Sequence, residues 1–450
     1  MNNIEFPGST IYFEIESLGP IRDSTVKFKP FLLFTGESNT GKSYAAMAVY
    51  YLLFMLNNEK IISQLWSRVF DAKKIDEDLK AGKTVELEFP VHLEEQIERL
   101  YNDNINRFMA YMLGNDDFSS NVKLKIEIQK VSQFKIISSL QKAQGMNPFI
   151  SVECPGWISS TSKIELSPES DHEDWGTRMG SSIFLSSLFQ RLVFKKKNIR
   201  NFFLPPARGA FAGLAPSMLK NFSGIGMYNE FLEGIDSVRF ANYELLEEFA
   251  EQKKCIDPLL TKLINGKIKI ERDTVSYAIS GSGKKIPLTA SSSSIKELFP
   301  LVLLLNRAPI DGLSICIEEP EAHLHPELQR GAALLLSYIV NNGGLIQATT
   351  HSDFFINGIN NLLKLHFLKN KDPHKFLAAL KQTGIREEFV LDPHNVGAYY
   401  FEKVKDGDTV QVKKLEKSEK GIPMDSFKRA FEQSVKETRE LREALTDDEE

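Results

Sequence analysis

A short segment near the start of the chain has the residue types and spacing needed to hold phosphate groups. The pattern G-x-x-x-x-G-K-[ST] is matched by Gly36, Glu37, Ser38, Asn39, Thr40, Gly41, Lys42 and Ser43. Its glycines let the backbone curl so that N–H groups point into one concavity and cradle phosphates. Lys42 neutralises phosphate charge, and the Ser43 hydroxyl coordinates Mg²⁺. We therefore predict that residues 36–44, which include Tyr44, bind ATP with Mg²⁺.

Two adjacent carboxylates follow an apolar run later in the chain. Residues 313–317 read as a buried strand, and Glu318 and Glu319 come directly after it. In an open α/β sheet, ligands gather where the strands end. One carboxylate there can complete the Mg²⁺ shell, while the next polarises the water that attacks the terminal phosphate. We predict that Glu318 serves the metal and that Glu319 is catalytic together with Lys42.

Two further segments carry side chains suited to the same phosphate. His351 follows a predicted buried strand at residues 344–348, so its ring is expected to reach the γ-phosphate or the attacking water. A predicted helix over residues 295–305 is preceded by Ser292, Ser293 and Ser294. Hydroxyl and N–H groups at a helix N-terminus form an anion site. In a head-to-tail dimer we expect these serines to contact the nucleotide of the other copy.

The elements around these residues alternate between strands and helices. Strands are predicted at residues 11–15, 26–34, 122–128 and 202–204. One helix is predicted to begin at Lys42, and two more are predicted at residues 93–113 and 183–193. Residues 398–404 and 409–415 form a predicted hairpin, and 425–445 form an amphipathic helix expected to pack on the core rather than dock a partner. This order predicts an α/β fold in which a mixed sheet is flanked by helices.

Composition narrows the class of protein. The chain has 450 residues, 42% hydrophobic and 26% charged, which is typical of a globular protein. A formal net charge of −5 excludes a uniformly basic nucleic-acid binder, and the basic run at residues 195–197 is interpreted as a solvated helix end.

Three scattered cysteines form no disulfide or metal framework, which favours a reducing compartment. No apolar run reaches the roughly 20 residues of a membrane span, and no signal peptide is evident, so we expect a cytoplasmic protein without membrane contact.

The order of these motifs resembles that of the ABC-type ATPases of the OLD family. The strongest marker is the run Ile317-Glu318-Glu319-Pro320-Glu321-Ala322-His323-Leu324-His325-Pro326, and Leu204-Pro205-Pro206-Ala207-Arg208 matches a shorter motif. The resemblance implies a P-loop NTPase fold of the ABC-ATPase type, SMC-like, with a largely helical insertion. It also implies that Arg208 lies near the nucleotide. The chain departs from the family before the predicted helix at 295–305, because Ser293 and Ser294 stand where ABC proteins usually carry two glycines.

The resemblance divides the chain into four parts. Residues 1–56 are expected to form the first lobe of the ATPase core, and 57–265 a helical and mixed insertion. Residues 266–420 return to the core, and 421–450 form the C-terminal helix with an acidic tail. OLD nucleases carry a Toprim nuclease domain, but only about a hundred residues follow His351 here. Asp406 and Asp408 are interpreted as turn residues of the hairpin and not as metal ligands, so the chain is expected to lack a nuclease of its own.

The resemblance also implies how such a chain works. ATPases of this family form head-to-tail dimers with ATP at the interface, so we expect a homodimer or higher homo-oligomer and slow ATP hydrolysis. Toprim-less relatives act beside a separately encoded effector in bacterial anti-phage defence, which implies a nucleotide-gated switch or sensor with a nuclease-like partner. Nucleic acid stays open as a further partner. Two alternatives remain: a scaffold that holds ATP with negligible hydrolysis, and a DNA-repair ATPase of the SMC or Rad50 type.

Overall fold

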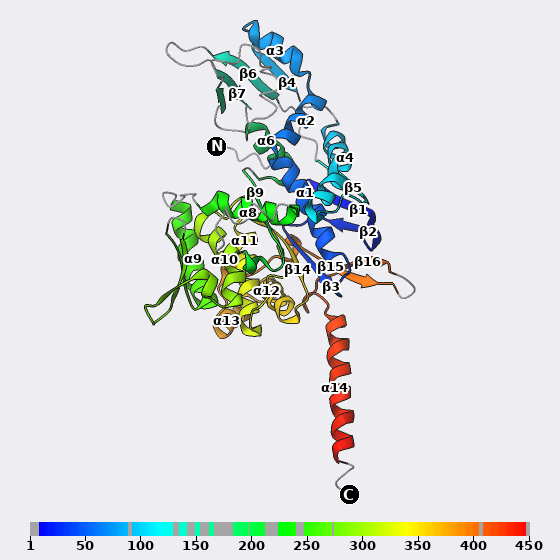
Figure 1. The fold of residues 1–450 in the computed structure, drawn as a ribbon, viewed down its shortest axis with the longest axis vertical. Coiled ribbons are helices and arrows are strands. Elements are labelled where there is room, and N and C mark those ends of the chain that lie inside the picture. The colour runs from blue at the N-terminus through cyan, green and yellow to red at the C-terminus, as the bar shows by residue number, and fades with distance from the viewer. Residues whose placement is uncertain are drawn as a thin grey trace.

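A nine-stranded mixed sheet with helices on both faces forms the body of the protein (Figure 1). The computed structural model describes residues 9–88, 92–128, 135–141, 149–153, 162–165, 183–196, 198–211, 224–239, 247–271, 274–404 and 408–446. The predicted turn residue Asp406 lies outside these ranges. In the described part of the chain, none of the helices is long and apolar enough to cross a membrane.

The sheet joins strands from both ends and from the middle of the chain. Its order is β5-β1-β2-β16-β15-β3-β14-β13-β9. The strands are β1 (Thr10–Leu18), β2 (Ile21–Lys27), β3 (Phe31–Gly36), β5 (Ser120–Glu127), β9 (Arg200–Leu204), β13 (Leu313–Glu318), β14 (Leu345–Thr350), β15 (Val396–Lys403) and β16 (Val410–Leu415). The predicted hairpin is confirmed, because β15 and β16 pair antiparallel.

Five neighbouring strands of this sheet run parallel and position the candidate site. β15, β3, β14, β13 and β9 pair in that order, each parallel to the next. The carboxyl ends of parallel strands meet at the same edge of a sheet, so the segments that follow β3, β13 and β14 emerge side by side. Both faces of these strands are covered, which explains why β3, β13 and β14 are buried at every residue.

Alternate residues of the parallel strands belong to two separate hydrophobic cores. In β3, Leu32 and Phe34 join the core under α1 (Lys42–Asn57), while Phe31 and Leu33 join the core on the opposite face. This is the period-two alternation expected of a strand. The opposite face is covered by α10 (Ser293–Arg307), α11 (Pro326–Asn341) and α12 (Asp353–Lys371).

The chain between α1 and β9 extends the molecule beyond the sheet (Figure 1). It contains α2 (Glu59–Val69), α3 (Ala72–Lys80), α4 (Leu93–Leu113) and α6 (Ile183–Phe194), and a small sheet with the order β4-β6-β7-β8. The small strands are β4 (Val85–Glu88), β6 (Lys135–Gln141), β7 (Phe149–Glu153) and β8 (Ser162–Glu165). A largely helical insertion is therefore present, although β5 and β9 from the same stretch join the main sheet.

The remaining elements surround the hydrophobic core on the face of the sheet opposite α1. They are α8 (Gly226–Arg239), α9 (Glu247–Ile264), α13 (Pro373–Thr383), the antiparallel strands β10 (Gly266–Glu271), β11 (Thr274–Ile279) and β12 (Lys285–Pro287), and the short 3₁₀ helices η1 (Arg208–Ala210), η3 (Leu288–Ala290), η4 (Glu387–Phe389) and η5 (Pro393–Asn395). β10 and β11 pair antiparallel along their whole length.

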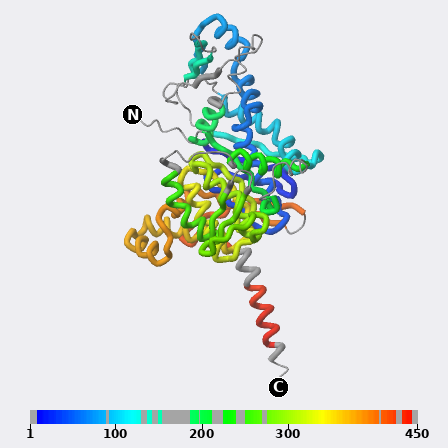
Figure 2. The backbone as a smooth tube through the Cα atoms, turned by 60° about the vertical axis from the view of Figure 1, so that its left-hand side comes forward, coloured from blue at the N-terminus to red at the C-terminus, as the bar shows by residue number. Residues whose placement is uncertain are grey.

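The C-terminal helix α14 (Asp425–Thr446) projects away from the body, as both views show (Figure 1, Figure 2). The expectation that it packs on the core was wrong. Val435 and Leu441 remain 50% and 66% exposed. Charged side chains one turn apart pair along the helix, such as Arg439 with Glu443 at 2.8 Å. Pairs of this kind stabilise a helix locally.

Gly36, the last residue of β3, has no room for a side chain. Its φ is 136°, which L-residues rarely adopt, and a Cβ built there collides with the Phe401 carbonyl oxygen and lies 2.9 Å from the Phe401 nitrogen. β3 and β15 therefore approach closely where the phosphate loop begins.

We predict that Gly36→Ala lowers the free energy of unfolding by about 3 kcal/mol or more, because strain and backbone collision act together. Gly82→Ala is the matched control, since Gly82 has φ 74° but no atom near its added Cβ. That control should cost about 1 kcal/mol. Urea unfolding of both variants measures the difference, and equal losses would mean that the close approach to Phe401 is absent.

Candidate functional site

The phosphate loop joins the end of β3 to the start of α1. Asn39 and Gly41 adopt left-handed conformations, with φ of 60° and 86°, which curl the loop over the helix N-terminus. A Cβ at Gly41 would touch the Ile21 side chain at 3.0 Å, so the loop packs closely against β2. The first N–H groups of a helix lack acceptors within the helix, and they carry the positive end of its dipole. The segment thus offers a concave, positive surface to an anion.

The Lys42 ammonium group is folded back into this loop. Nζ donates to the Glu37 carbonyl at 2.5 Å and to the Gly36 carbonyl at 3.3 Å. Burial lowers the pKa of Lys42 to about 8, although the neighbouring carboxylates Glu319 and Glu318 favour its charged form. The loop carbonyls thus hold the ammonium in the place where incoming phosphates would accept its hydrogen bonds.

Ser43 and Glu318 bring the two halves of the predicted site into contact. The Ser43 hydroxyl donates to Oε2 of Glu318, although the residues are 275 positions apart. Glu318 ends β13 and is only 5% exposed. Burial raises the pKa of the Glu318 carboxyl to about 7, while the Ser43 hydrogen bond acts in the opposite direction. The fold therefore holds the acidic side chain of Glu318 beside the phosphate loop, where its ionised form is disfavoured by burial.

Glu319 has a strained backbone that aims its side chain. Its φ is 46°, a left-handed conformation that a non-glycine residue adopts at a cost of about 1–3 kcal/mol. Three contacts hold this conformation: the Glu319 N–H donates to the Thr349 carbonyl at 3.0 Å, and the Glu319 carbonyl accepts from the Ala322 N–H at 3.0 Å and from Arg208 at 3.3 Å. Strain of this kind is concentrated at functional sites, which supports the assignment of Glu319.

Arg208 acts from behind the site and does not face its pocket. It is 1% exposed, and Nη1 donates to the Glu318 carbonyl at 2.6 Å while Nε donates to the Glu297 carbonyl at 3.0 Å. The Glu297 carboxylate lies 3.6 Å from Nε and accepts from the Gly209 N–H at 3.0 Å. Arg208 is thus a positioning residue that ties the end of β13 to α10, and it contacts the backbone of two pocket residues from behind the pocket without lining it.

His351 follows β14 and lies at the open edge of the site. Loss of hydration and the nearby Lys42 ammonium lower the pKa of His351, so its neutral form is favoured. Glu321 fixes the backbone at this point, because its Oε1 accepts from the His351 N–H at 2.9 Å and from the Thr350 hydroxyl at 2.5 Å. Sequence reasoning assigned no role to Glu321. Its place two residues after Glu319 was the available signal.

One pocket of about 400 Å³ collects most of the predicted site residues. Its lining includes Ser38, Asn39, Thr40, Gly41, Lys42, Ser43, Tyr44, Glu318, Glu319 and His351. Three lining residues were not predicted: Pro20, Pro206 and Thr349. Gly36 and Glu37 form the start of the loop, where their carbonyls accept from Lys42.

The serines at the start of α10 lie apart from this pocket. Ser292 is the N-cap residue, and Ser293 begins the helix. The Ser292 and Ser294 hydroxyls lie 2.9 Å apart, and Ser292 is exposed while Ser294 is partly buried. No side-chain cap bond joins Ser292 to the N-terminal N–H groups of α10. Within a single chain these serines do not reach the phosphate loop.

The donor set fits a magnesium ion that arrives with phosphates. Among the described residues, no group of three or more His, Cys, Asp or Glu side chains is able to hold a metal. Ser43 and Glu318 supply one hydroxyl and one carboxylate in direct contact. Mg²⁺ is commonly bound by one or two protein oxygens together with substrate phosphates. These two residues therefore suit Mg²⁺ bound with a triphosphate.

The chain has an α/β fold of the P-loop NTPase kind, with a large, mostly parallel sheet and a phosphate-loop pocket where the parallel strands end. Residues 212–356 match the model of the AAA ATPase domain family. This segment begins after the phosphate loop and contains the serines, both glutamates and His351. No curated protein has a sequence that matches the chain.

Three solved structures are similar to the chain, each at 11% identity. One is an SMC head bound to the C-winged helix domain of ScpA, with a TM-score of 0.36 over 90% of this chain and 97% of that chain. The SMC head domain from Thermotoga maritima has a TM-score of 0.33, with 92% and 100% coverage. The Smc head domain with an extended coiled coil bound to the C-terminal domain of ScpA, from Pyrococcus furiosus, has a TM-score of 0.35, with 96% and 100% coverage. Similarity at these scores carries no argument about activity or partners.

The buried Glu318 carboxyl predicts how the stability of the nucleotide-free chain depends on pH. Because its pKa is about 7 when folded and 4.5 ordinarily, the folded chain holds an extra proton between these values. Stability from this group is present below pH 4.5 and is lost as the pH rises through 7. The Glu318→Gln variant should therefore gain about 2 kcal/mol relative to the parent chain between pH 5 and pH 7.5.

Urea unfolding at the two pH values measures this gain. The exposed Glu127 on β5 provides the control, since Glu127→Gln should leave the difference from the parent chain nearly unchanged with pH. A Glu318→Gln curve parallel to that of the parent chain would show that the Glu318 carboxyl is not held protonated.

Proposed function

We propose that the chain hydrolyses ATP with Mg²⁺ and uses the reaction as a switch. The contact between the Ser43 hydroxyl and the Glu318 carboxylate carries the proposal, because it places a metal-binding pair inside the phosphate-loop pocket. Glu319 and His351 line the same pocket, so a general base and a polar partner flank the space for the terminal phosphate. The AAA ATPase family match over residues 212–356 supports the same class of reaction.

Each residue has a distinct task in this reaction. The loop N–H groups and the α1 dipole bind the phosphates, and Lys42 transfers its hydrogen bonds from the loop carbonyls to phosphate oxygens. When bound, Mg²⁺ neutralises charge that develops on the phosphates. Glu319 accepts a proton from the attacking water, and neutral His351 donates a hydrogen bond at the edge of the pocket. Arg208 and Glu321 hold the backbone of Glu319 and His351, respectively.

The switch is proposed to work as a head-to-tail homodimer. The pocket of one chain lacks the second anion site that Ser292, Ser293 and Ser294 offer at the start of α10. Ser292 and Ser293 are exposed and Ser294 is partly buried at a helix N-terminus without a side-chain cap, so these residues are suited to the terminal phosphate of a nucleotide held by another copy. ATP would then join two copies, and hydrolysis would release them.

An effector is proposed to read the closed state. The resemblance to Toprim-less OLD-family ATPases motivates a separately encoded, nuclease-like partner in bacterial anti-phage defence. The projecting helix α14 is a candidate contact element, since Val435 and Leu441 are exposed along it. A DNA-repair machine of the SMC type is less well supported, because the described helices between α1 and β9 are at most 21 residues long and are joined by a small sheet.

Glu319→Gln is expected to keep ATP affinity within about twofold and to lower phosphate release at least 100-fold, since it removes the general base alone. With Mg²⁺ and ATP, the variant should also accumulate as a dimer. Phosphate-release kinetics and light scattering report the two effects. Glu59→Gln makes the same chemical change on the exposed start of α2 and should behave as the parent chain.

Two results separate the alternatives. A parent chain that binds ATP but releases no phosphate would identify a scaffold and not an enzyme. Equal, measurable turnover in the parent chain and the Glu319→Gln variant would show that Glu319 is not the base.

A further inference from the structure

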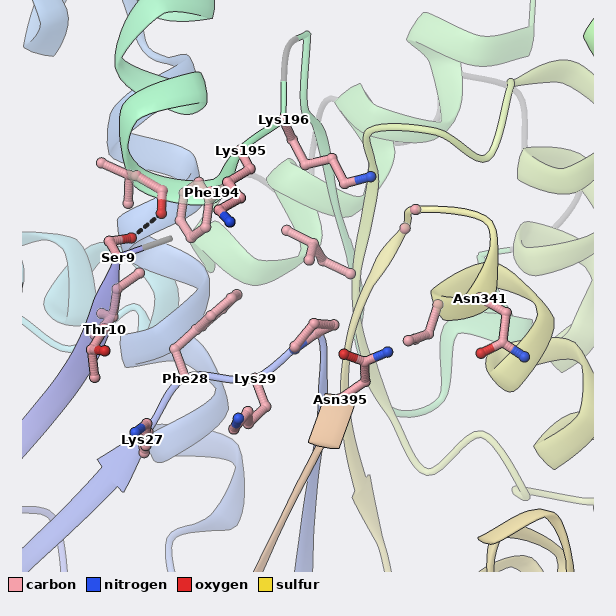
Figure 3. A pocket seen from close by; sticks show the side chains of 17 residues that line it. Ser9, Thr10, Lys27, Phe28, Lys29, Phe194, Lys195, Lys196, Asn341 and Asn395 are labelled. Atoms are coloured by element: carbon pink, nitrogen blue, oxygen red, sulfur yellow. Dashed lines mark hydrogen bonds between the residues drawn. The ribbon is translucent and has the colours of Figure 1, made fainter. Parts of the chain in front are cut away.

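Figure 3 shows a second cavity. Its volume is about 540 Å³, which lies within the range of small-molecule sites. Its lining includes Pro30, which precedes β3, and Leu345, which begins β14, so it lies at the opposite edge of the sheet from the phosphate loop. These strands carry the phosphate-loop pocket at their other ends. The two cavities are therefore separate sites.

Four lysines from two distant segments line this cavity. Lys27 and Lys29 come from the end of β2 and the connection to β3, and Lys195 and Lys196 follow α6 (Figure 3). The lysine run at 195–197, interpreted from sequence as a solvated helix end, thus meets a second pair of lysines about 170 positions away. Residue 197 lies outside the described ranges.

The positive charge in the cavity is only partly balanced. Lys196 pairs with Asp311 at 3.1 Å, and the Lys27 ammonium lies 5.1 Å from the centre of the Tyr12 ring. Within the described part of the chain, Lys29 and Lys195 have no carboxylate within ion-pair distance. Burial, Lys27 and Lys414 lower the pKa of Lys29, and Asp392 offsets this only in part.

Aromatic rings lie beside the lysines. Phe28 and Phe194 are half-buried, with ring centres 5.3 Å apart and planes inclined at 53°. They pack on a small apolar cluster of Leu53, Ile199 and Leu345. The cavity therefore offers aromatic rings next to ammonium groups, and the Asn395 amide lines it as well (Figure 3).

We propose that this cavity binds a small phosphorylated ligand with a planar ring, of the nucleotide class. Lys29 and Lys195 bind its phosphate oxygens as charge-assisted donors. The ring packs against Phe28 or Phe194, as aromatic groups do in binding sites. Nucleic-acid duplexes are bound through phosphate contacts along an extended surface, whereas these lysines gather in one hollow. The proposal does not rest on ATP hydrolysis.

Calorimetric titration of the full chain tests the proposal, with ATP, AMP and pyrophosphate as probes. The parent chain is expected to bind ATP at two sites of different affinity. Lys42→Ala removes the phosphate-loop site and should leave the second site, which the Lys29→Ala/Lys195→Ala double variant should weaken at least tenfold. The variant with all three changes should show no site at probe concentrations that saturate the parent chain.

Matched controls separate site loss from a general charge effect. Lys364→Ala/Lys381→Ala removes the same charge from exposed positions on α12 and α13 and should change neither affinity more than twofold. Lys195→Ala alone, at an exposed position, should give a partial loss of affinity and an unchanged melting temperature, which keeps the test valid if the double variant misfolds.

Several outcomes would overturn the proposal. A single ATP site that Lys42→Ala abolishes would leave the cavity without a nucleotide. Pyrophosphate binding in the Lys42→Ala chain as tightly as AMP and ATP would remove any role for the ring. Tighter binding of a 5′-phosphorylated single-stranded hexanucleotide than of ATP would identify a nucleic-acid end and not a small ligand. If the chain binds ATP at both sites but does not hydrolyse it, the proposed ATPase activity is rejected and the proposed second site stands.

Discussion

The contact between the Ser43 hydroxyl and the Glu318 carboxylate is the interaction on which the site depends. It exists because β14 alone separates β3 from β13 in a parallel sheet, so that the loop after β3 meets the end of β13. The contact keeps a carboxyl group buried at a position where burial raises its pKa. Burial likewise lowers the pKa of the nearby Lys42, so the charged form of this side chain is also disfavoured here. The site thus carries an electrostatic cost that the proposed magnesium-bound triphosphate would relieve.

A second layer of contacts holds this arrangement in place. Arg208 bonds the carbonyls of Glu318 and Glu319, and the same guanidinium contacts Glu297 on α10. A buried arginine of this kind is stable only when its partners are all present, because an unpaired buried charge is costly. The helix that presents the exposed serines is therefore connected directly to the strand end that presents the glutamates. A displacement of α10 would therefore act on the backbone of Glu318 and Glu319 through one side chain.

Much of this site was predictable because its signals are local. The phosphate loop, the apolar strand before Glu318 and the strand before His351 each occupy a few consecutive residues, and parallel pairing brings their ends together. The task of Arg208 was not predictable, since it depends on carbonyl groups more than a hundred positions away. The lysine cavity was missed for the same reason. The projecting helix α14 was misjudged because an amphipathic pattern shows that a face is apolar and does not show what covers it.

A structure of the chain bound to Mg²⁺ and a non-hydrolysable ATP analogue tests the central claim most directly. The account predicts that the metal lies between the Ser43 hydroxyl and the Glu318 carboxylate, which separate to bind it. The phosphates should lie on the N–H groups of the loop, with the Lys42 ammonium moved from the loop carbonyls to the phosphate oxygens. A structure with saturating nucleotide in which Ser43 still bonds Glu318, and the triphosphate lies elsewhere, would contradict it.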